Sequence, residues 1–421
     1  MEKIVINGPC RLEGEVEISG GKNAIVAILP ATVMVRGKCV IENVPHISDV
    51  ENILEILRYM GASVREIDSK TLEIDCSDVK QCEIPYELTR RLRASYYFLG
   101  ALLGRWHDTT VSMPGGCSIG LRPIDQHIKG FEALGAKVDF ERGNVHARCS
   151  ALVGSHVYFD AVSVGATINT MIAAATAEGL TVMENIAKEP HIVDVANFLN
   201  SMGADISGAG TDVIKVRGVP ELNGGSYAVI PDQIEAGTFM VAAAATRGDV
   251  TIKNVIPKHL ECISRKLTEM NIKVVEFDDS VRVIGSGIIE SASIKTMPYP
   301  GFPTDMQPQM AVLMSLADGT SRVTETIWDS RFKYVDELRK LGAQIAVSGN
   351  VATIEGGVQF LGAPIRSCDL RAGAAMVIAG LVASGTTVIE EIEYIERGYE
   401  NIIEKFSGLG ANIQKINAAE N

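Results

Sequence analysis

The residues with the clearest chemical potential lie between Ser112 and Pro123, where Cys117 stands among three glycines and two prolines. Glycine frees the backbone and proline keeps the segment out of a regular ladder, so the sequence predicts an open loop with a thiol near its tip. Arg122 follows five residues later, and a nearby cation favours the reactive thiolate. On this segment alone, a packed and unreactive cysteine is an equally good interpretation.

Three further cations stand where helices are expected to begin. Lys22 follows two glycines at the start of a helix, and a helix N-terminus already favours anions. The segment has no Walker A pattern, so a solvated lysine remains the alternative. Arg93 and Arg371 occur in matching Leu-Arg-Ala segments at helix starts. Their guanidinium groups either bind an anion or are exposed capping charges.

Asp305 stands in Phe302-Pro-Thr-Asp-Met306, also at an expected helix start. It could cap the helix or act as a general base. Arg397 lies beside a glycine in a segment expected to open a later helix, where it could clamp an anion. Cationic side chains gathered at the ends of helices repel one another unless anions bind there. A substrate with phosphate and carboxylate groups would balance their positive charge.

The elements that must position these residues form a repeat. Apolar periodicity predicts a helix over 47–60, with a capping box from Ser48 and Glu51 and an end at Gly61, followed by a strand. The same helix ending recurs about every 70 residues. It is found at Gly135, Gly203, Asn271, Gly342 and Gly410.

Each repeat also has an earlier helix of small residues, such as Ala236–Ala245. These helices are apolar on most sides and should be buried, which predicts helices inside and sheets outside. Six repeats divide into two barrel-like α/β domains of three repeats each. The expected domains are 22–229, and 1–21 together with 230–421. The N-terminal strands would complete the last sheet, so two crossings would form a hinge beside a cleft that closes.

Composition narrows the functional classes. A net charge of −13 over 421 residues argues against general binding to nucleic acid or anionic membranes. The eight cysteines form no CxxC pair, and the histidines do not cluster with them, so no metal site is expected. No apolar run is long enough to span a membrane, and the N-terminus has no signal-peptide pattern. These features predict a cytoplasmic protein with reduced thiols.

An ordered set of motifs resembles the bacterial UDP-N-acetylglucosamine enolpyruvyl transferases (1-carboxyvinyltransferases) along essentially the whole chain. The motifs are Ser19-Gly-Gly-Lys-Asn-Ala24, Leu92-Arg-Ala-Ser95, Pro114-Gly-Gly-Cys-Ser-Ile-Gly-Leu-Arg-Pro-Ile-Asp125, Val162-Ser-Val-Gly-Ala-Thr167, Phe302-Pro-Thr-Asp-Met-Gln307, Asp369-Leu-Arg-Ala372 and Arg397-Gly-Tyr-Glu400. The cysteine loop separates this family from the shikimate-pathway enolpyruvyl transferases, which share the fold.

The resemblance implies two inside-out α/β domains that transfer the enolpyruvyl group of phosphoenolpyruvate to the 3′-hydroxyl of UDP-N-acetylglucosamine and release phosphate. This is the first committed step of peptidoglycan precursor synthesis, and it needs no cofactor or metal. Cys117 would be the general acid and could also form a covalent adduct. Asp305 would bind and deprotonate the sugar hydroxyl. Fosfomycin, an epoxide antibiotic that mimics phosphoenolpyruvate, would alkylate Cys117.

The resemblance also assigns the binding residues. For phosphoenolpyruvate, it implies phosphate contacts from Lys22, Arg122 and Arg397, a carboxylate contact from Arg371, and a place beside them for Asn23; Lys22 and Arg397 would also be catalytic. For UDP-N-acetylglucosamine, it implies Arg93, Arg122, Pro123, Ile124, Asp125, Gln126, Ala161, Val162, Ser163, Val164, Asp305 and Ile327. The protein would be a monomer or a weak homo-oligomer.

Two departures from the family pattern are present. Many members have arginine at the position of Gln233, which puts an interdomain contact in doubt, and many have lysine near Ala161, so nucleotide contacts there would rest on backbone groups. Two other functions stay open at this point. The acceptor could be a different one, such as shikimate 3-phosphate, or the chain could be a paralogue that binds the nucleotide sugar without turnover.

Overall fold

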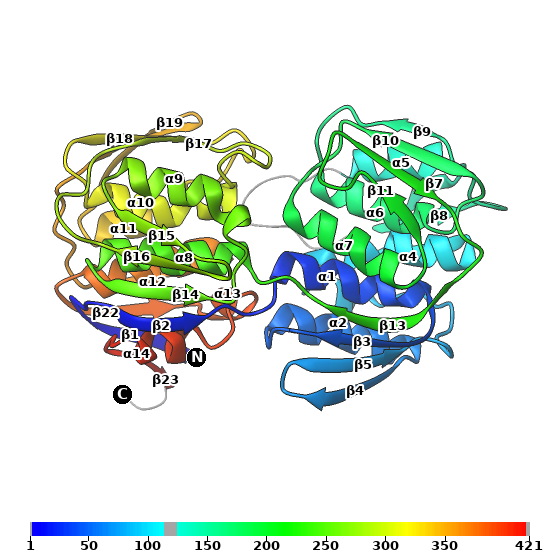
Figure 1. The fold of residues 1–421 in the computed structure, drawn as a ribbon, viewed down its shortest axis with the longest axis horizontal. Helices are drawn as coiled ribbons and strands as arrows, with labels where there is room; N and C mark the ends of the chain where they lie inside the picture. The colour runs from blue at the N-terminus through cyan, green and yellow to red at the C-terminus, as the bar shows by residue number, and fades with distance from the viewer. Residues whose placement is uncertain (1, 113–123, 418–421) are drawn as a thin grey trace. The chain divides into compact units, whose positions relative to one another are not determined.

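A computed structural model describes residues 2–112 and 124–417. The chain divides into two compact units, shown in Figure 1. Of the described residues, the first unit comprises 20–112 and 124–230, and the second comprises 2–19 and 231–417. The sequence placed these boundaries after residues 21 and 229.

The first unit contains three sheets among its described residues, with strand orders β13-β3-β5-β4, β11-β12-β10-β9 and β6-β8-β7. Its strands are β3 (Val35–Glu42), β4 (Ser63–Asp68), β5 (Thr71–Asp75), β6 (Asp108–Ser112), β7 (Lys137–Glu141), β8 (Asn144–Arg148), β9 (His156–Tyr158), β10 (Leu180–Glu184), β11 (Asp205–Ser207), β12 (Val213–Arg217) and β13 (Leu222–Ala228). Its helices are α1 (Lys22–Ala31), η1 (Thr32–Met34), α2 (Ser48–Met60), α3 (Tyr86–Thr89), η2 (Arg93–Tyr96), α4 (Tyr97–Trp106), α5 (Asp125–Ala133), α6 (Val164–Ala174) and α7 (Pro190–Ser201).

The second unit also contains three sheets in its described part, ordered β21-β22-β1-β23, β15-β16-β14-β2 and β17-β18-β20-β19. Its strands are β1 (Glu2–Gly8), β2 (Glu13–Glu17), β14 (Asp249–Lys253), β15 (Lys273–Glu276), β16 (Ser280–Ile284), β17 (Ser293–Lys295), β18 (Thr320–Thr324), β19 (Gln344–Ser348), β20 (Val351–Glu355), β21 (Pro364–Arg366), β22 (Gly385–Glu390) and β23 (Ile413–Asn417). Its helices are α8 (Gln233–Ala245), η3 (Pro257–Leu260), α9 (Glu261–Glu269), η4 (Thr304–Met306), α10 (Gln307–Ser315), α11 (Val335–Lys340), α12 (Leu370–Val382), α13 (Glu393–Glu396) and α14 (Ile402–Gly408).

The N-terminal strand β1 lies between β22 and β23 and pairs antiparallel with both. The last sheet is therefore completed by the start of the chain, as the sequence predicted. Strand β2 joins a different sheet of the same unit, where it runs parallel to β14.

The helices made of small and branched residues form the centre of each unit. Every residue of α10 is buried, and every residue of α8 after Gln233 is buried. In the second unit, helices α8, α10 and α12 contact one another, and buried side chains of the strands complete the core. Figure 1 shows these helices with the strands of that unit around them. A helix that is apolar on all sides needs this environment. The expected inside-out α/β architecture is confirmed.

The repeated helix endings have the predicted left-handed backbone. Gly61 has φ 101°, and the Ala62 amide donates to the Leu57 carbonyl at 2.9 Å, which closes the helix end. Asn271, in the most divergent repeat, also adopts positive φ (65°), which asparagine tolerates better than most residues. The predicted capping box of α2 is wrong. The helix begins at Ser48 itself, so this side chain lies inside the first turn and does not cap it.

Candidate active site

Asp305 lies between two buried guanidinium groups in the second unit. Its Oδ1 is 3.3 Å from Nη2 of Arg331, and its Oδ2 is 3.2 Å from Nε of Arg371. The arginine side chains are 1% and 2% exposed, whereas the Asp305 side chain is 30% exposed. Two cations stabilise the charged carboxylate, while part of it stays accessible to a substrate.

Arg371 is fixed on several sides. Asp369 is the N-cap of α12 and accepts hydrogen bonds from the Arg371 and Ala372 amides. The Arg371 guanidinium lies over the Tyr399 ring, 5.2 Å from its centroid. Burial alone would lower the pKa of Arg371, but Tyr399 and the negative charges of Asp305 and Asp232 raise it above its ordinary value. The alternative prediction, that Arg371 is an exposed charge at the helix start, is therefore wrong.

The two terminal nitrogens of Arg371, Nη1 and Nη2, are buried and have no hydrogen-bond partner among the described residues. Leaving such donors unsatisfied in a buried position costs about 1–3 kcal/mol or more. An anion with paired oxygens, such as a carboxylate, would satisfy them.

The short helix η4, which carries Asp305, is fastened by a buried acid. Glu325 accepts hydrogen bonds from Thr296 Oγ1 at 2.8 Å, Thr304 Oγ1 at 2.9 Å and the Ile327 amide at 2.8 Å. It thereby connects the residue before Asp305 with half-buried Ile327. Asp305 does not cap α10, because Met306 is the N-cap and no side-chain cap is present. The capping interpretation is wrong.

Arg397 is half-buried and is the C-cap of the short helix α13. It does not open a helix as expected, since α14 begins only at Ile402 after left-handed Asn401. Two residues beyond Arg397, Tyr399 is 3% exposed and its hydroxyl lies 2.9 Å from Thr238 Oγ1. Tyr399 lies under the Arg371 guanidinium and beside Thr238, so it holds the segment that begins at Arg397 close to Arg371.

In the first unit, Lys22 is the first residue of α1, followed by half-buried Asn23. Its Nζ is 3.1 Å from Oδ2 of Asp49, a side chain on α2 that is 1% exposed. The preceding turn requires glycine at position 20, since a Cβ there would lie 1.8 Å from the Asn43 carbonyl oxygen. The ion pair with Asp49 therefore holds the Lys22 amine in place, and the close backbone contact at Gly20 holds the turn before it.

Two segments assigned to the nucleotide sugar are joined in this unit. Gln126 accepts a hydrogen bond from the Asp160 amide at 2.9 Å, which ties the start of α5 to the segment 161–164. Ile124 is the N-cap of α5, Asp125 is its first residue, and Val162 is exposed. Ser163 caps α6, which begins at Val164. Half-buried Arg93 begins η2.

A buried histidine that sequence reasoning missed supports these segments. His127 Nδ1 lies 3.0 Å from Asn169 Nδ2, and its ring packs edge-on against Tyr96. Burial, together with the positive charge of Arg93, lowers the pKa of His127 to about 3. His127 is therefore a neutral packing residue that holds α5, α6 and the start of α4 together.

Arg331, Glu325 and Asp49 were also missed. No motif singled them out, because each is a lone charged residue whose burial follows from tertiary packing. Three expected site residues, Cys117, Arg122 and Pro123, lie outside the described residues. The remaining expected residues fall into two groups, one in each unit.

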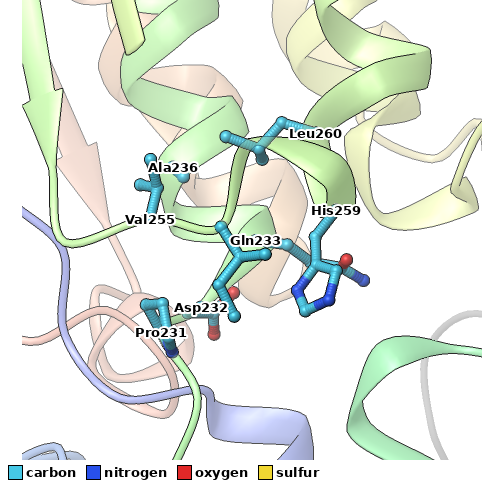
Figure 2. Close-up of a pocket in the computed structure, with 8 residues that line it drawn as sticks. Pro231, Asp232, Gln233, Ala236, Val255, His259 and Leu260 are labelled. Carbon is cyan, nitrogen blue, oxygen red and sulfur yellow. The ribbon is translucent and has the colours of Figure 1, made fainter. Parts of the chain in front are cut away.

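Gln233, one of the two departures, lines a small hollow at the start of α8. Figure 2 shows Asp232 and Gln233 opposite His259. The hollow is too tight to admit a water molecule. The Oε1 atom of Gln233 is buried in it and has no hydrogen-bond partner among the described residues. A hollow of this size has no room for a substrate.

Within residues 2–112 and 124–417, no group of three or more histidine, cysteine or acidic side chains is placed to hold a metal ion. In the same residues, no helix is both long and apolar enough to cross a membrane.

The chain matches a known family and individual relatives along nearly its whole length. Residues 6–406 match the family of EPSP synthase (3-phosphoshikimate 1-carboxyvinyltransferase). The UDP-N-acetylglucosamine 1-carboxyvinyltransferase of Clostridium botulinum is 57% identical over 417 residues, covering 99% of this chain and 100% of that protein. The UDP-N-acetylglucosamine 1-carboxyvinyltransferase 3 of Caldanaerobacter subterraneus subsp. tengcongensis is 55% identical over 416 residues, again 99% and 100% of the two chains.

Solved structures show the same architecture. The enolpyruvyl transferase NikO from Streptomyces tendae superposes with a TM-score of 0.90 at 26% identity, over 99% of both chains. An EPSP synthase from Acinetobacter baumannii superposes with a TM-score of 0.75 at 19% identity, over 99% of this chain and 100% of that one. The second likeness concerns the fold alone.

Proposed function

The chain belongs to the EPSP synthase family and, within it, to the UDP-N-acetylglucosamine 1-carboxyvinyltransferases, and from this premise we propose how its residues carry out the reaction. The protein transfers the enolpyruvyl group of phosphoenolpyruvate to UDP-N-acetylglucosamine, a step of peptidoglycan synthesis. The observation that carries this conclusion is the 57% identity over 99% of the chain. The roles of individual residues below are our proposals.

Arg371 binds the carboxylate of phosphoenolpyruvate. Its two unsatisfied Nη donors support this role, since a planar guanidinium matches a carboxylate with two parallel hydrogen bonds. Lys22, Arg122 and Arg397 bind the phosphate, and Asn23 lies beside them. The ion pair between Lys22 and Asp49 supports the role of Lys22, because it holds the amine at the start of α1, where the helix dipole also favours an anion.

Asp305 accepts the proton of the sugar 3′-hydroxyl as the oxygen bonds to C2 of phosphoenolpyruvate. The thiol of Cys117 donates a proton to C3, so that the methylene becomes a methyl group and C2 becomes tetrahedral. The Cys117 thiolate then takes a proton back from C3, the C2–O bond to phosphate breaks, and the enol ether forms with release of inorganic phosphate, which carries away the proton held by Asp305. The cationic side chains of Lys22, Arg122, Arg371 and Arg397 stabilise the negative charge on the tetrahedral intermediate. The accessible part of the Asp305 carboxyl group supports its role as base.

The nucleotide sugar is bound by Arg93, by the segment from Arg122 to Gln126, by residues 161–164 and by Ile327. The hydrogen bond between Gln126 and the Asp160 amide supports this set, since it joins two of these segments. Because Ala161 offers no side-chain charge, contacts there come from backbone groups. We place the reaction in the cytoplasm and expect a monomer or a weak homo-oligomer.

The test is phosphate release from phosphoenolpyruvate by purified, reduced protein. Release should require UDP-N-acetylglucosamine and should not occur when shikimate 3-phosphate is the acceptor. Release with shikimate 3-phosphate alone would assign a different acceptor. Binding of UDP-N-acetylglucosamine without any phosphate release would make the protein a non-catalytic binding paralogue.

A further inference from the structure

Two motifs that each carry a proposed phosphate-binding cation also meet in a buried polar network of the second unit. Ser19 begins the motif Ser19-Gly-Gly-Lys22, and Glu400 ends the motif Arg397-Gly-Tyr-Glu400. The Ser19 hydroxyl donates a hydrogen bond to the Glu400 carboxylate. Each partner of this hydrogen bond is therefore three residues along the chain from a cation, Lys22 in one motif and Arg397 in the other.

Every polar atom of Ser19 has a partner. Its amide donates to Glu235 Oε2 at 3.0 Å, and its carbonyl accepts from the Asp232 amide at 2.9 Å. Its hydroxyl oxygen accepts from Lys405 Nζ at 2.6 Å in addition to donating to Glu400. Because Lys405 Nζ also pairs with Glu235 Oε1 at 2.5 Å, these charged groups form one connected network around the serine.

The network is costly if its only role is to stabilise the fold. Glu235 and Glu400 are buried, and the Lys405 side chain is 17% exposed. Taking charged groups out of water loses stability that well-packed apolar residues of similar size would keep. The burial of these charges is explained if the network is needed to hold the two motifs together.

The turn that leads from Ser19 to Lys22 is tightly held. A Cβ at position 20 would lie 1.8 Å from the Asn43 carbonyl oxygen, and the Gly21 amide donates to a backbone carbonyl at 2.7 Å. Three residues span at most about 10 Å of chain. Because neither glycine has room to absorb a displacement, a shift of Ser19 reaches Lys22.

Two consecutive side chains close to Arg397 are anchored as well. Tyr399 lies under the Arg371 guanidinium, 5.2 Å from it, and Glu400 binds the Ser19 hydroxyl. Only a glycine separates Arg397 from the first of these anchors. The hydrogen bond between Ser19 and Glu400 therefore limits the positions that the Arg397 segment can take.

We propose that Glu400 is a positioning residue for the binding of phosphoenolpyruvate. Through Ser19, it fixes the Arg397 segment to the segment that leads to Lys22, so that both cations are held in place for the phosphate. The rest of the network holds the serine. This inference rests on the proposed binding of phosphate by Lys22 and Arg397.

The test removes the hydrogen bond in Ser19→Ala and Glu400→Ala, singly and together, and keeps an acceptor oxygen in Glu400→Gln. The matched control is Ser321→Ala. Ser321 is a buried serine of β18 in the same unit, and its hydroxyl accepts from the Ala292 amide at 3.2 Å. Its replacement also removes a buried hydrogen bond but leaves both motifs untouched.

In Ser19→Ala, the KM for phosphoenolpyruvate and the inhibition constant of inorganic phosphate should each rise roughly 10-fold, because a displaced cation binds the phosphate less well. The KM for UDP-N-acetylglucosamine should change little. The double variant should be no worse than the more affected single variant, since both changes remove the same hydrogen bond. Glu400→Gln should keep most of the affinity for phosphate, and Ser321→Ala should match the wild type in all three constants.

Unchanged constants for phosphoenolpyruvate and phosphate in Ser19→Ala, with a melting temperature lowered as in Ser321→Ala, would overturn the inference, because the hydrogen bond would then serve stability alone. Loss of folding in Ser19→Ala or additive effects in the double variant would overturn it too. A wild type without turnover would refute the proposed function itself. An active wild type with an unaffected Ser19→Ala would refute only the role of Glu400.

Discussion

Replacing Glu235 with glutamine should flatten the pH dependence of stability. Glu235, on α8, is 2% exposed and forms part of a buried polar cluster. Its Oε1 is 2.5 Å from Lys405 Nζ, and its Oε2 accepts from the Ser19 amide at 3.0 Å. The Ser19 hydroxyl in turn donates to Glu400. The cluster fastens Ser19 to α8 and α14. Ser19 is the last residue of the N-terminal segment that belongs to the second unit.

Burial raises the pKa of Glu235 from 4.5 to about 7, although Lys405 opposes the shift. The folded protein therefore holds a proton that the unfolded chain releases above its ordinary pKa. Stability from this group is complete below pH 4.5 and is lost as the pH rises through about 7. Between about pH 5.5 and about pH 8, linkage predicts a loss of roughly 2 kcal/mol.

For a unit of this size, that loss corresponds to a fall in melting temperature of about 4–8 °C. The assay is thermal unfolding across this pH range for the wild type, Glu235→Gln and the control Glu261→Gln. Glu261 is on the surface of α9, and its salt-bridge partners lower its pKa, so it does not titrate in the same range. The wild type and Glu261→Gln should show the same slope, and Glu235→Gln a smaller one. Equal slopes in all three proteins would refute the reasoning.

Three further predictions concern the proposed site. Asp305→Asn should lower kcat by about 100-fold or more while UDP-N-acetylglucosamine still binds; near-normal turnover would exclude Asp305 as the base. Gly20→Ala should lower the free energy of unfolding by about 1–3 kcal/mol in denaturant titration, because its Cβ would meet the Asn43 carbonyl, and an unchanged midpoint would contradict this. Fosfomycin should label Cys117, faster with UDP-N-acetylglucosamine bound, and Cys117→Asp should keep some activity and resist the drug; mass spectrometry that found the label on another cysteine would remove the role given to Cys117.

Local sequence signals were sufficient for the architecture. The recurring glycines and Asn271 terminate helices because a left-handed residue is needed at each of these ends, and this requirement is visible in the sequence. The small-residue composition of α8 and α10 likewise predicts burial without knowledge of the neighbours. The capping box at Ser48 failed because the helix starts one residue earlier than the motif requires, with Ile47 as the N-cap.

The candidate site was less accessible to sequence reasoning. Motif resemblance identified Asp305 and Arg371, but the pairing between them joins residues far apart in the chain. Arg331 and Glu325 were missed for the same reason, since their importance depends on burial and on partners contributed by other elements. Charge alone cannot distinguish such a residue from one on the surface.

The most direct test of the central claim is the identity of the product. Purified wild-type protein should be incubated with phosphoenolpyruvate labelled at C3 and UDP-N-acetylglucosamine, and the nucleotide sugar then analysed by mass spectrometry and nuclear magnetic resonance. We predict that the nucleotide sugar carries the labelled enolpyruvyl group as an ether on its 3′-oxygen and that one inorganic phosphate is released for each transfer. Unmodified nucleotide sugar after complete incubation, with phosphoenolpyruvate intact, would contradict the account.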